Sequence, residues 1–132
     1  GIEVGAHSQT HPFLTRVSGD TLGREIAGSC ADIEREVGVK PLSFCYPYGD
    51  VNLAVHAEAA SAYAVAVTTE LREVREERDF PHLIPRIDMY YFREPGELEE
   101  WGTPRFIRRL RLRKAGRQLR RGFATISSAW RS

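Results

Sequence analysis

The amino-acid sequence predicts an α/β fold with a mostly parallel sheet. Short apolar segments of β type alternate with helical patterns along the chain, and such alternation favours βαβ units. The 132 residues are 42% hydrophobic and 28% charged, a composition that is typical of globular domains and excludes wholesale disorder. No apolar run reaches the roughly 18 residues that a membrane-spanning helix needs. The alternation therefore carries the fold prediction.

The first two predicted elements are a strand and an amphipathic helix. Residues 2–6 are expected to form a short strand that leads directly into a segment containing two histidines. Asp20 suits a helix N-terminus and Gly38 a left-handed C-cap. Between them, apolar residues recur at steps of four and three, the spacing of one helix face: Leu22, Ile26, Cys30, Ile33 and Val37.

A strand–helix–strand unit is predicted next. Residues 42–46 form an apolar run that stops at Pro47, an Ala-rich helix follows at 51–62, and residues 63–68 are rich in β-forming side chains. The spacing of the two cysteines, one on the predicted helix after Asp20 and one in the predicted strand 42–46, matches no zinc motif. They are also too few for a disulfide framework, so we expect core positions for Cys30 and Cys45.

The remaining predicted elements are a charged, irregular connection at residues 70–82, a strand at 83–89 and a final helix from about Pro104. We expect a first domain at residues 1–103 and a basic helical extension at 104–132.

The C-terminal charge leaves two interpretations open. Residues 105–132 carry nine Arg and one Lys with no acid, a net charge of +10, whereas the preceding residues carry −9. A helix over residues 105–121 could lie on an anionic membrane surface or bind an acidic polymer. Its arginines could equally pair with acidic residues of the same chain. No recognised nucleic-acid-binding fold accompanies the charge, so no specific nucleic-acid partner is expected.

His7 and His11 form the candidate metal site. Four residues apart, they can direct both imidazoles at one point from a helical turn or a tight loop. Neutral imidazole binds zinc and similar divalent ions, and a catalytic site needs about three protein ligands and an open position. A third ligand must therefore come from elsewhere. Ordinary surface or core histidines are the alternative, but the position just after a predicted strand favours a site.

Two segments resemble the motifs of a known family. Residues 5–12, Gly-Ala-His-Ser-Gln-Thr-His-Pro, are similar to the His-Ser/Thr-x-x-His motif of the polysaccharide deacetylases, the NodB-homology domain. Residues 44–49, Phe-Cys-Tyr-Pro-Tyr-Gly, resemble the Pro-Tyr-Gly motif of that family, and the resemblance extends over residues 2–92. It implies that the chain is part of a distorted (β/α) barrel from which one or more N-terminal strands are missing.

The resemblance also implies an activity and a set of site residues. The activity is metal-dependent hydrolysis of acetyl groups, N-acetyl foremost, on a polysaccharide or oligosaccharide, with zinc as the expected ion. The implied ligands are His7 and His11, and Ser8 braces their loop. The backbone N–H of Tyr48 would stabilise the developing oxyanion. Substrate contacts are expected from the residues before it, Tyr46 and Pro47, which as an alternative could simply end a packed edge strand.

The departures from the family limit the predicted activity. The Thr-Phe-Asp-Asp motif, which supplies the base and the Asp ligand, and the Leu-His motif, which supplies the acid, are absent. We expect the Thr-Phe-Asp-Asp motif to precede Gly1, since the sequence begins without Met. For the same reason the sequence does not distinguish a cytoplasmic location from the cell envelope. Cys45 replaces the usual Arg, and Arg86 is a candidate to brace the base in its place. Little activity is therefore expected from this chain alone, and a non-catalytic carbohydrate- or metal-binding relic is the alternative.

Four other polar residues are weaker candidates. His56 and His82 are expected to be solvent-exposed, and Asp50 is expected to cap the helix at 51–62 in preference to contacting substrate. Asp88 follows a predicted strand and could face a cleft.

Overall fold

The computed structural model describes the backbone of residues 2–129 and the side chains of residues 2–90 and 92–117. Two compact units divide the chain, Gly1–Arg86 and Ile87–Ser132. Helix α4 (Pro104–Ala129) begins at the predicted proline, inside the second unit. The domain boundary after residue 103 stays a prediction. Over the described residues, no helix combines the length and the apolar character that crossing a membrane requires.

The first unit contains a parallel pair of strands, β1 (Ser43–Cys45) and β2 (Val65–Val67), with Phe44 opposite Ala66. One parallel bridge joins Ala6 to Phe44, and another joins Val67 to Ile84. Four extended segments therefore lie side by side in chain order, as successive βα units do. In the described residues they do not close into a barrel.

Two of the predicted strands are much shorter than expected. The strand at 2–6 is reduced to Ala6, whose N–H donates to the Ser43 carbonyl at 2.8 Å. The strand predicted at 83–89 is wrong beyond the single bridge at Ile84. Pro85, which has no N–H to donate to a neighbouring strand, follows that bridge, and Met89–Tyr91 forms the short helix η4.

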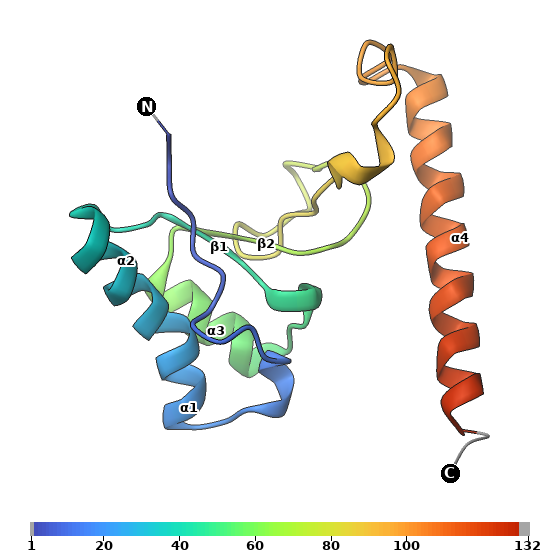
Figure 1. Cartoon of the computed structure of the whole chain (residues 1–132). Helices are drawn as coiled ribbons and strands as arrows, with labels where there is room; N and C mark the ends of the chain where they lie inside the picture. The colour runs from blue at the N-terminus through green and yellow to red at the C-terminus, as the bar shows by residue number, and fades with distance from the viewer. Residues whose placement is uncertain (1, 130–132) are drawn as a thin grey trace. The chain divides into compact units, whose positions relative to one another are not determined.

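The predicted helices are confirmed. A continuous helix comprises α1 (Asp20–Gly23), the π-helical segment η2 (Arg24–Gly28) and α2 (Ser29–Val37). Gly38 ends it with φ of 77°, the left-handed conformation expected of a C-cap. Helix α3 (Leu53–Ala62) lies on the same side of the strands as α2 (Figure 1).

The N-cap predicted for α3 is wrong by two residues. The Asn52 side chain, not that of Asp50, accepts the Val55 N–H at 3.0 Å. The carboxylate of Asp50 instead accepts two hydrogen bonds from Thr15, at 2.8 and 3.0 Å, and so ties the start of the α3 segment to the short helix η1 (Leu14–Arg16).

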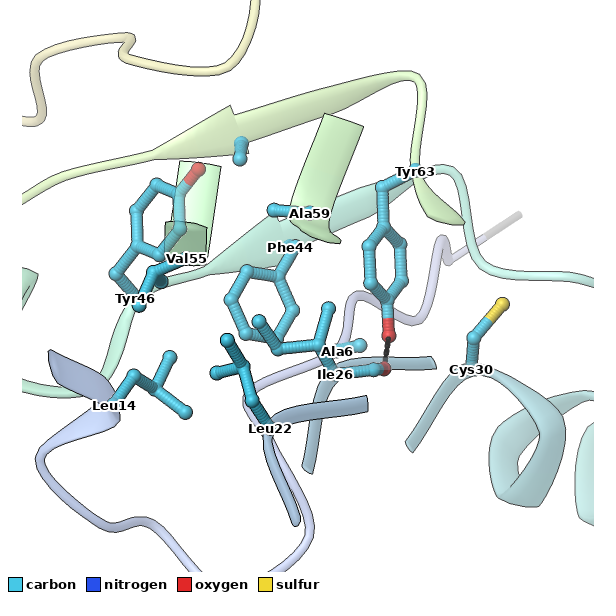
Figure 2. Packing of buried hydrophobic residues seen from close by; sticks show 11 residues of the cluster. Ala6, Leu14, Leu22, Ile26, Cys30, Phe44, Tyr46, Val55, Ala59 and Tyr63 are labelled. Carbon is cyan, nitrogen blue, oxygen red and sulfur yellow. Dashed lines mark hydrogen bonds between the residues drawn. The ribbon is translucent and has the colours of Figure 1, made fainter. Parts of the chain in front are cut away.

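The core of the first unit fills the space between the strands and the helices (Figure 2). The rings of Phe44 and Tyr63 stack at 5.0 Å, and the Tyr63 hydroxyl donates to the Ile26 carbonyl at 2.8 Å. Cys30 is buried as predicted, whereas Cys45 is only partly buried, and both are free thiols. The loop that carries the histidines begins directly from this core at Ala6.

The second unit packs the apolar side of α4 against its own residues. Phe106 is fully buried between the rings of Phe92 and Trp101, and Leu110 is buried as well. Arg109 and Arg113 form ion pairs with Glu97, and Arg109 also pairs with Glu100. Part of the predicted membrane-facing surface is therefore covered and part of its charge is paired within the unit. Side chains 118–121 of that predicted surface lie outside the described residues.

Candidate metal centre

The histidine loop, residues 7–11, brings its two imidazoles together. The Nε2 atoms of His7 and His11 lie 3.0 Å apart, and their rings meet edge to face with centroids 4.7 Å apart. Zn–N bonds of about 2.0–2.1 Å let one ion contact two nitrogens at this separation. Both side chains are exposed, so the shared point is open to solvent.

A backbone carbonyl selects the tautomer of the neutral His7 ring. Its Nδ1 lies 2.6 Å from the carbonyl oxygen of Cys45 in β1. Because a carbonyl can only accept, the neutral ring carries its proton on Nδ1 and has its lone pair on Nε2. Metal-binding histidines usually donate their second ring N–H in this way. The site thus presents a ligand nitrogen, directed at His11, in the form that a cation needs.

The backbone around the site is strained. Within the described residues, the non-glycine residues with positive φ are Ser8 at 64°, His11 at 59° and Tyr48 at 59°. All three lie in the two motif segments. Left-handed non-glycine residues cost about 1–3 kcal/mol each and persist where surrounding contacts hold them. One such contact is the hydrogen bond from the His11 N–H to Ser8 Oγ, at 3.0 Å, which agrees with the bracing role expected of Ser8.

Tyr48 lies at the centre of a tight turn, the short helix η3 (Pro47–Gly49). Its ring stacks on Phe13 at 4.2 Å and meets the His11 ring edge to face at 4.6 Å. Its carbonyl accepts from Thr69 Oγ1 at 3.2 Å. Among the described residues, no protein acceptor is paired with the Tyr48 N–H. The two motif segments are therefore in contact, and a backbone donor remains available beside the histidines.

Tyr46 and Pro47 do not offer substrate-binding surfaces in this structure. Both side chains are fully buried, and the Tyr46 hydroxyl donates to the His82 carbonyl at 2.9 Å. Burial raises the pKa of Tyr46 to about 12. In this structure the two side chains contribute to packing, which agrees with the alternative of a packed strand end, and their contact with substrate stays a prediction.

Arg86 contacts Cys45, the residue that stands where the family resemblance predicts an arginine. Its Nη1 lies 3.1 Å from Sγ of Cys45, and its own N–H donates to the Glu70 carbonyl at 3.0 Å. Burial raises the pKa of the Cys45 thiol, and the Arg86 charge opposes that effect only in part. The guanidinium is exposed and close to the residue whose carbonyl orients His7.

Within the described part of the chain, no third ligand joins the histidines. Among the residues that the structure describes, no group of three His, Cys, Asp or Glu could hold an ion. Asp50 is engaged with Thr15, and Asp88 caps η4 through the Tyr90 N–H at 2.9 Å. His56 and His82 are half-buried, not exposed as predicted, with ring centroids 5.9 Å apart. His82 Nε2 lies 2.9 Å from the Tyr63 carbonyl.

The sequence interpretation missed Glu25, which lies beneath the histidine loop in η2. Its side chain is 7% exposed and accepts hydrogen bonds from the backbone of Gln9 and Thr10. Burial raises the pKa of this carboxyl, but the hydrogen bonds from Thr10 and Gln9 outweigh it and hold the pKa below its usual value. The available signal was an acid directly beside Ile26, on the apolar face of the helix.

Comparisons with known proteins identify a family that includes both motif segments. A model of the family described as polysaccharide deacetylase matches residues 1–67. Chitin deacetylase 1 of Cryptococcus neoformans var. grubii is 33% identical over 60 residues, which are 46% of this chain and 13% of that protein.

Two solved structures share the fold. A polysaccharide deacetylase from Bacillus cereus has a TM-score of 0.57 and 25% identity, over 64% of this chain and 27% of that one. The Streptococcus pyogenes deacetylase PplD has a TM-score of 0.59 and 24% identity, over 63% of this chain and 37% of that one. The chain thus spans well under half the length of each of these proteins. With both motif segments inside the matched residues 1–67, the chain belongs to the polysaccharide deacetylase family.

Proposed function

We propose that the chain forms part of a metal-dependent hydrolase that removes acetyl groups, principally N-acetyl, from a polysaccharide or oligosaccharide. The observation that carries the proposal is the convergence of the His7 and His11 Nε2 atoms, 3.0 Å apart, with His7 oriented by the Cys45 carbonyl. These residues fit a divalent ion, and zinc suits an imidazole pair well. The name of the similar chitin deacetylase supports an N-acetylated sugar polymer as the substrate class.

Each proposed role follows from a position in the structure. His7 and His11 would hold the ion, which when bound supplies Lewis-acid polarisation of a carbonyl and a lowered water pKa. The N–H of Tyr48, which has no acceptor among the described residues, would donate to the oxyanion that forms as the acetyl carbon becomes tetrahedral. The stack of Tyr48 on Phe13 keeps that donor fixed before substrate binds.

The chain alone is proposed to be inactive. The described residues supply two histidine ligands but no group of three His, Cys, Asp or Glu that could hold an ion. We propose that the third ligand and the base come from a preceding part of the same protein. Arg86, held near Cys45, would then brace that base, as an arginine at the Cys45 position does in the family.

The test measures bound metal and released acetate. The 132-residue chain should bind Zn²⁺ or Co²⁺, His7→Ala and His11→Ala should each abolish binding, and His56→Ala should leave it unchanged as the control. The complete protein, but not this chain, should release acetate from acetylated glucosamine oligomers. Metal binding that survives both loop substitutions would refute the proposed site. Metal binding by the complete protein without acetate release would favour the non-catalytic relic.

A further inference from the structure

One buried carboxylate anchors the histidine loop to the helix beneath it. Glu25 Oε2 accepts the backbone N–H groups of Gln9 and Thr10 at 3.0 and 2.9 Å, and Oε1 accepts the Thr10 hydroxyl at 2.5 Å. The two residues it binds stand between His7 and His11. A single side chain thus satisfies two consecutive backbone donors of the segment whose ends carry the metal-binding nitrogens.

The next turns of the same helix also contact the loop. The Gln9 side chain passes so close to Gly28 that a Cβ built there would lie 3.0 Å from its Nε2. That Nε2 donates to Asp32 Oδ2 at 2.5 Å. Residues 25, 28 and 32 share one helix face by their spacing. The histidine loop therefore contacts this helix face at Glu25, at Gly28, whose missing side chain leaves room for Gln9, and at Asp32.

The anchoring carboxylate lies in an irregular part of the helix. Glu25 belongs to the π-helical segment Arg24–Gly28. Such segments are rare and often found at functional sites. Here the Ile26 carbonyl is satisfied by the hydroxyls of Ser29 and Tyr63, both at 2.8 Å, so the segment is stabilised from the core side. The Glu25 side chain of the same segment contacts the histidine loop instead.

We propose that Glu25 is a positioning residue that holds the histidine loop in its metal-binding conformation. The loop contains the left-handed residues Ser8 and His11, and the Glu25 bonds fix the two residues between them. Without that anchor, the loop would relax and the two Nε2 atoms would separate. The inference rests on the proposed metal site for its consequence, but the anchoring of the loop can be tested without metal.

The experiment compares two substitutions on the same helix. Glu25→Gln keeps the side-chain shape but replaces an acceptor by a donor. We expect amide hydrogen exchange at Gln9 and Thr10 to become at least about tenfold faster, and affinity for Co²⁺ to fall about tenfold or more. Ser29→Ala is the matched control, since Ser29 is also buried and hydrogen-bonded but faces the core. It should lower stability without changing loop exchange or Co²⁺ affinity.

The outcomes separate this inference from the proposed function. Unchanged exchange at Gln9 and Thr10 in Glu25→Gln would overturn the positioning role, whether or not metal binds. Unchanged Co²⁺ affinity in Glu25→Gln, with binding present in the unsubstituted chain, would overturn it as well. No Co²⁺ binding by the unsubstituted chain, with faster exchange in Glu25→Gln, would instead refute the metal site and leave the anchor supported. Thr10→Val, which removes one of the three bonds, should give a smaller effect of the same sign.

Discussion

The histidine loop and helix α4 are both rich in polar side chains, but these are held in different ways. In the loop, the contacts are distant in sequence. His7 is bonded to Cys45, and Thr10 to Glu25, while the backbone itself is strained at Ser8. In α4 the backbone is regular, and Arg109 pairs with Glu97 within the same unit.

The difference distinguishes the candidate metal site from a charged helix surface. A strained loop survives only when tertiary contacts stabilise it, so its geometry depends on the whole unit. A regular helix forms its backbone hydrogen bonds within itself, so its stability at solvent-facing positions depends mainly on local propensity. Substitutions should therefore have large effects in the motif segments of the first unit and small effects at solvent-facing positions of α4.

The largest effect is expected at Gly49, in the turn that carries Tyr48. Its φ is 70°, and a Cβ there would lie 2.2 Å from Thr69 Oγ1 and 2.9 Å from the Thr69 backbone nitrogen. Gly49→Ala should lower the free energy of unfolding by about 3 kcal/mol, measured by urea denaturation. Gly38→Ala is the control, because φ there is 77° but no atom of the other described residues lies within 4 Å of a Cβ built on it. Equal losses in the two variants would show that the contact with Thr69 contributes nothing.

Alkaline pH should destabilise the core beneath the loop. Burial raises the pKa of Tyr63 to about 12, whereas an unfolded tyrosine titrates near 10. The folded state therefore favours the neutral phenol. Its contribution is complete below about pH 10 and is lost as the pH rises towards about 12. The urea concentration at the unfolding midpoint should fall less steeply with rising pH in Tyr63→Phe than in the unsubstituted chain. Part of the pH dependence should remain, because burial also raises the pKa of Tyr46 to about 12. Tyr90→Phe, at an exposed position, should leave the slope unchanged.

The sequence predicted the elements whose signals are local. The apolar spacing predicted the helix that the structure places at Asp20–Val37, and Gly38 predicted its end. Both strands of the pair, β1 and β2, lie inside predicted strands. The strand at 83–89 failed because its pairing depends on neighbours that local β propensity does not report, and only Ile84 pairs.

The site was predictable only in part, for the same reason. The motif resemblance indicated His7, His11 and Tyr48, and the structure brings these three together. The burial of Tyr46 and the anchoring by Glu25 were not predictable, because both depend on how a strand and a helix pack. The sequence also predicts Asp50 as the cap of α3, but the Asp50 carboxylate accepts from Thr15 and Asn52 caps the helix. That contact with Thr15 depends on tertiary packing and has no local signal in the sequence.

A moderate effect is expected from the hydroxyl that braces the loop. Ser8→Ala removes the acceptor of the His11 N–H and keeps a Cβ at a residue with φ of 64°. It should lower the free energy of unfolding by about 1 kcal/mol. Ser8→Gly removes the same hydroxyl but relieves the backbone, so it should lose less stability in the same urea titration. Equal losses in the two variants would mean that the left-handed backbone at Ser8 carries no strain.

The smallest effect, and one of opposite sign, is expected in α4. Gly116 lies inside the helix, and among the described residues no atom outside the helix backbone lies within 4 Å of a Cβ built on it. Gly116→Ala should stabilise the helix by about 0.8–1 kcal/mol, because alanine loses less backbone entropy than glycine does. Amide hydrogen exchange along residues 105–117 would report the gain as slower exchange. A loss of stability instead would mean that α4 is shaped by a contact at Gly116, and the contrast with the histidine loop would then fail.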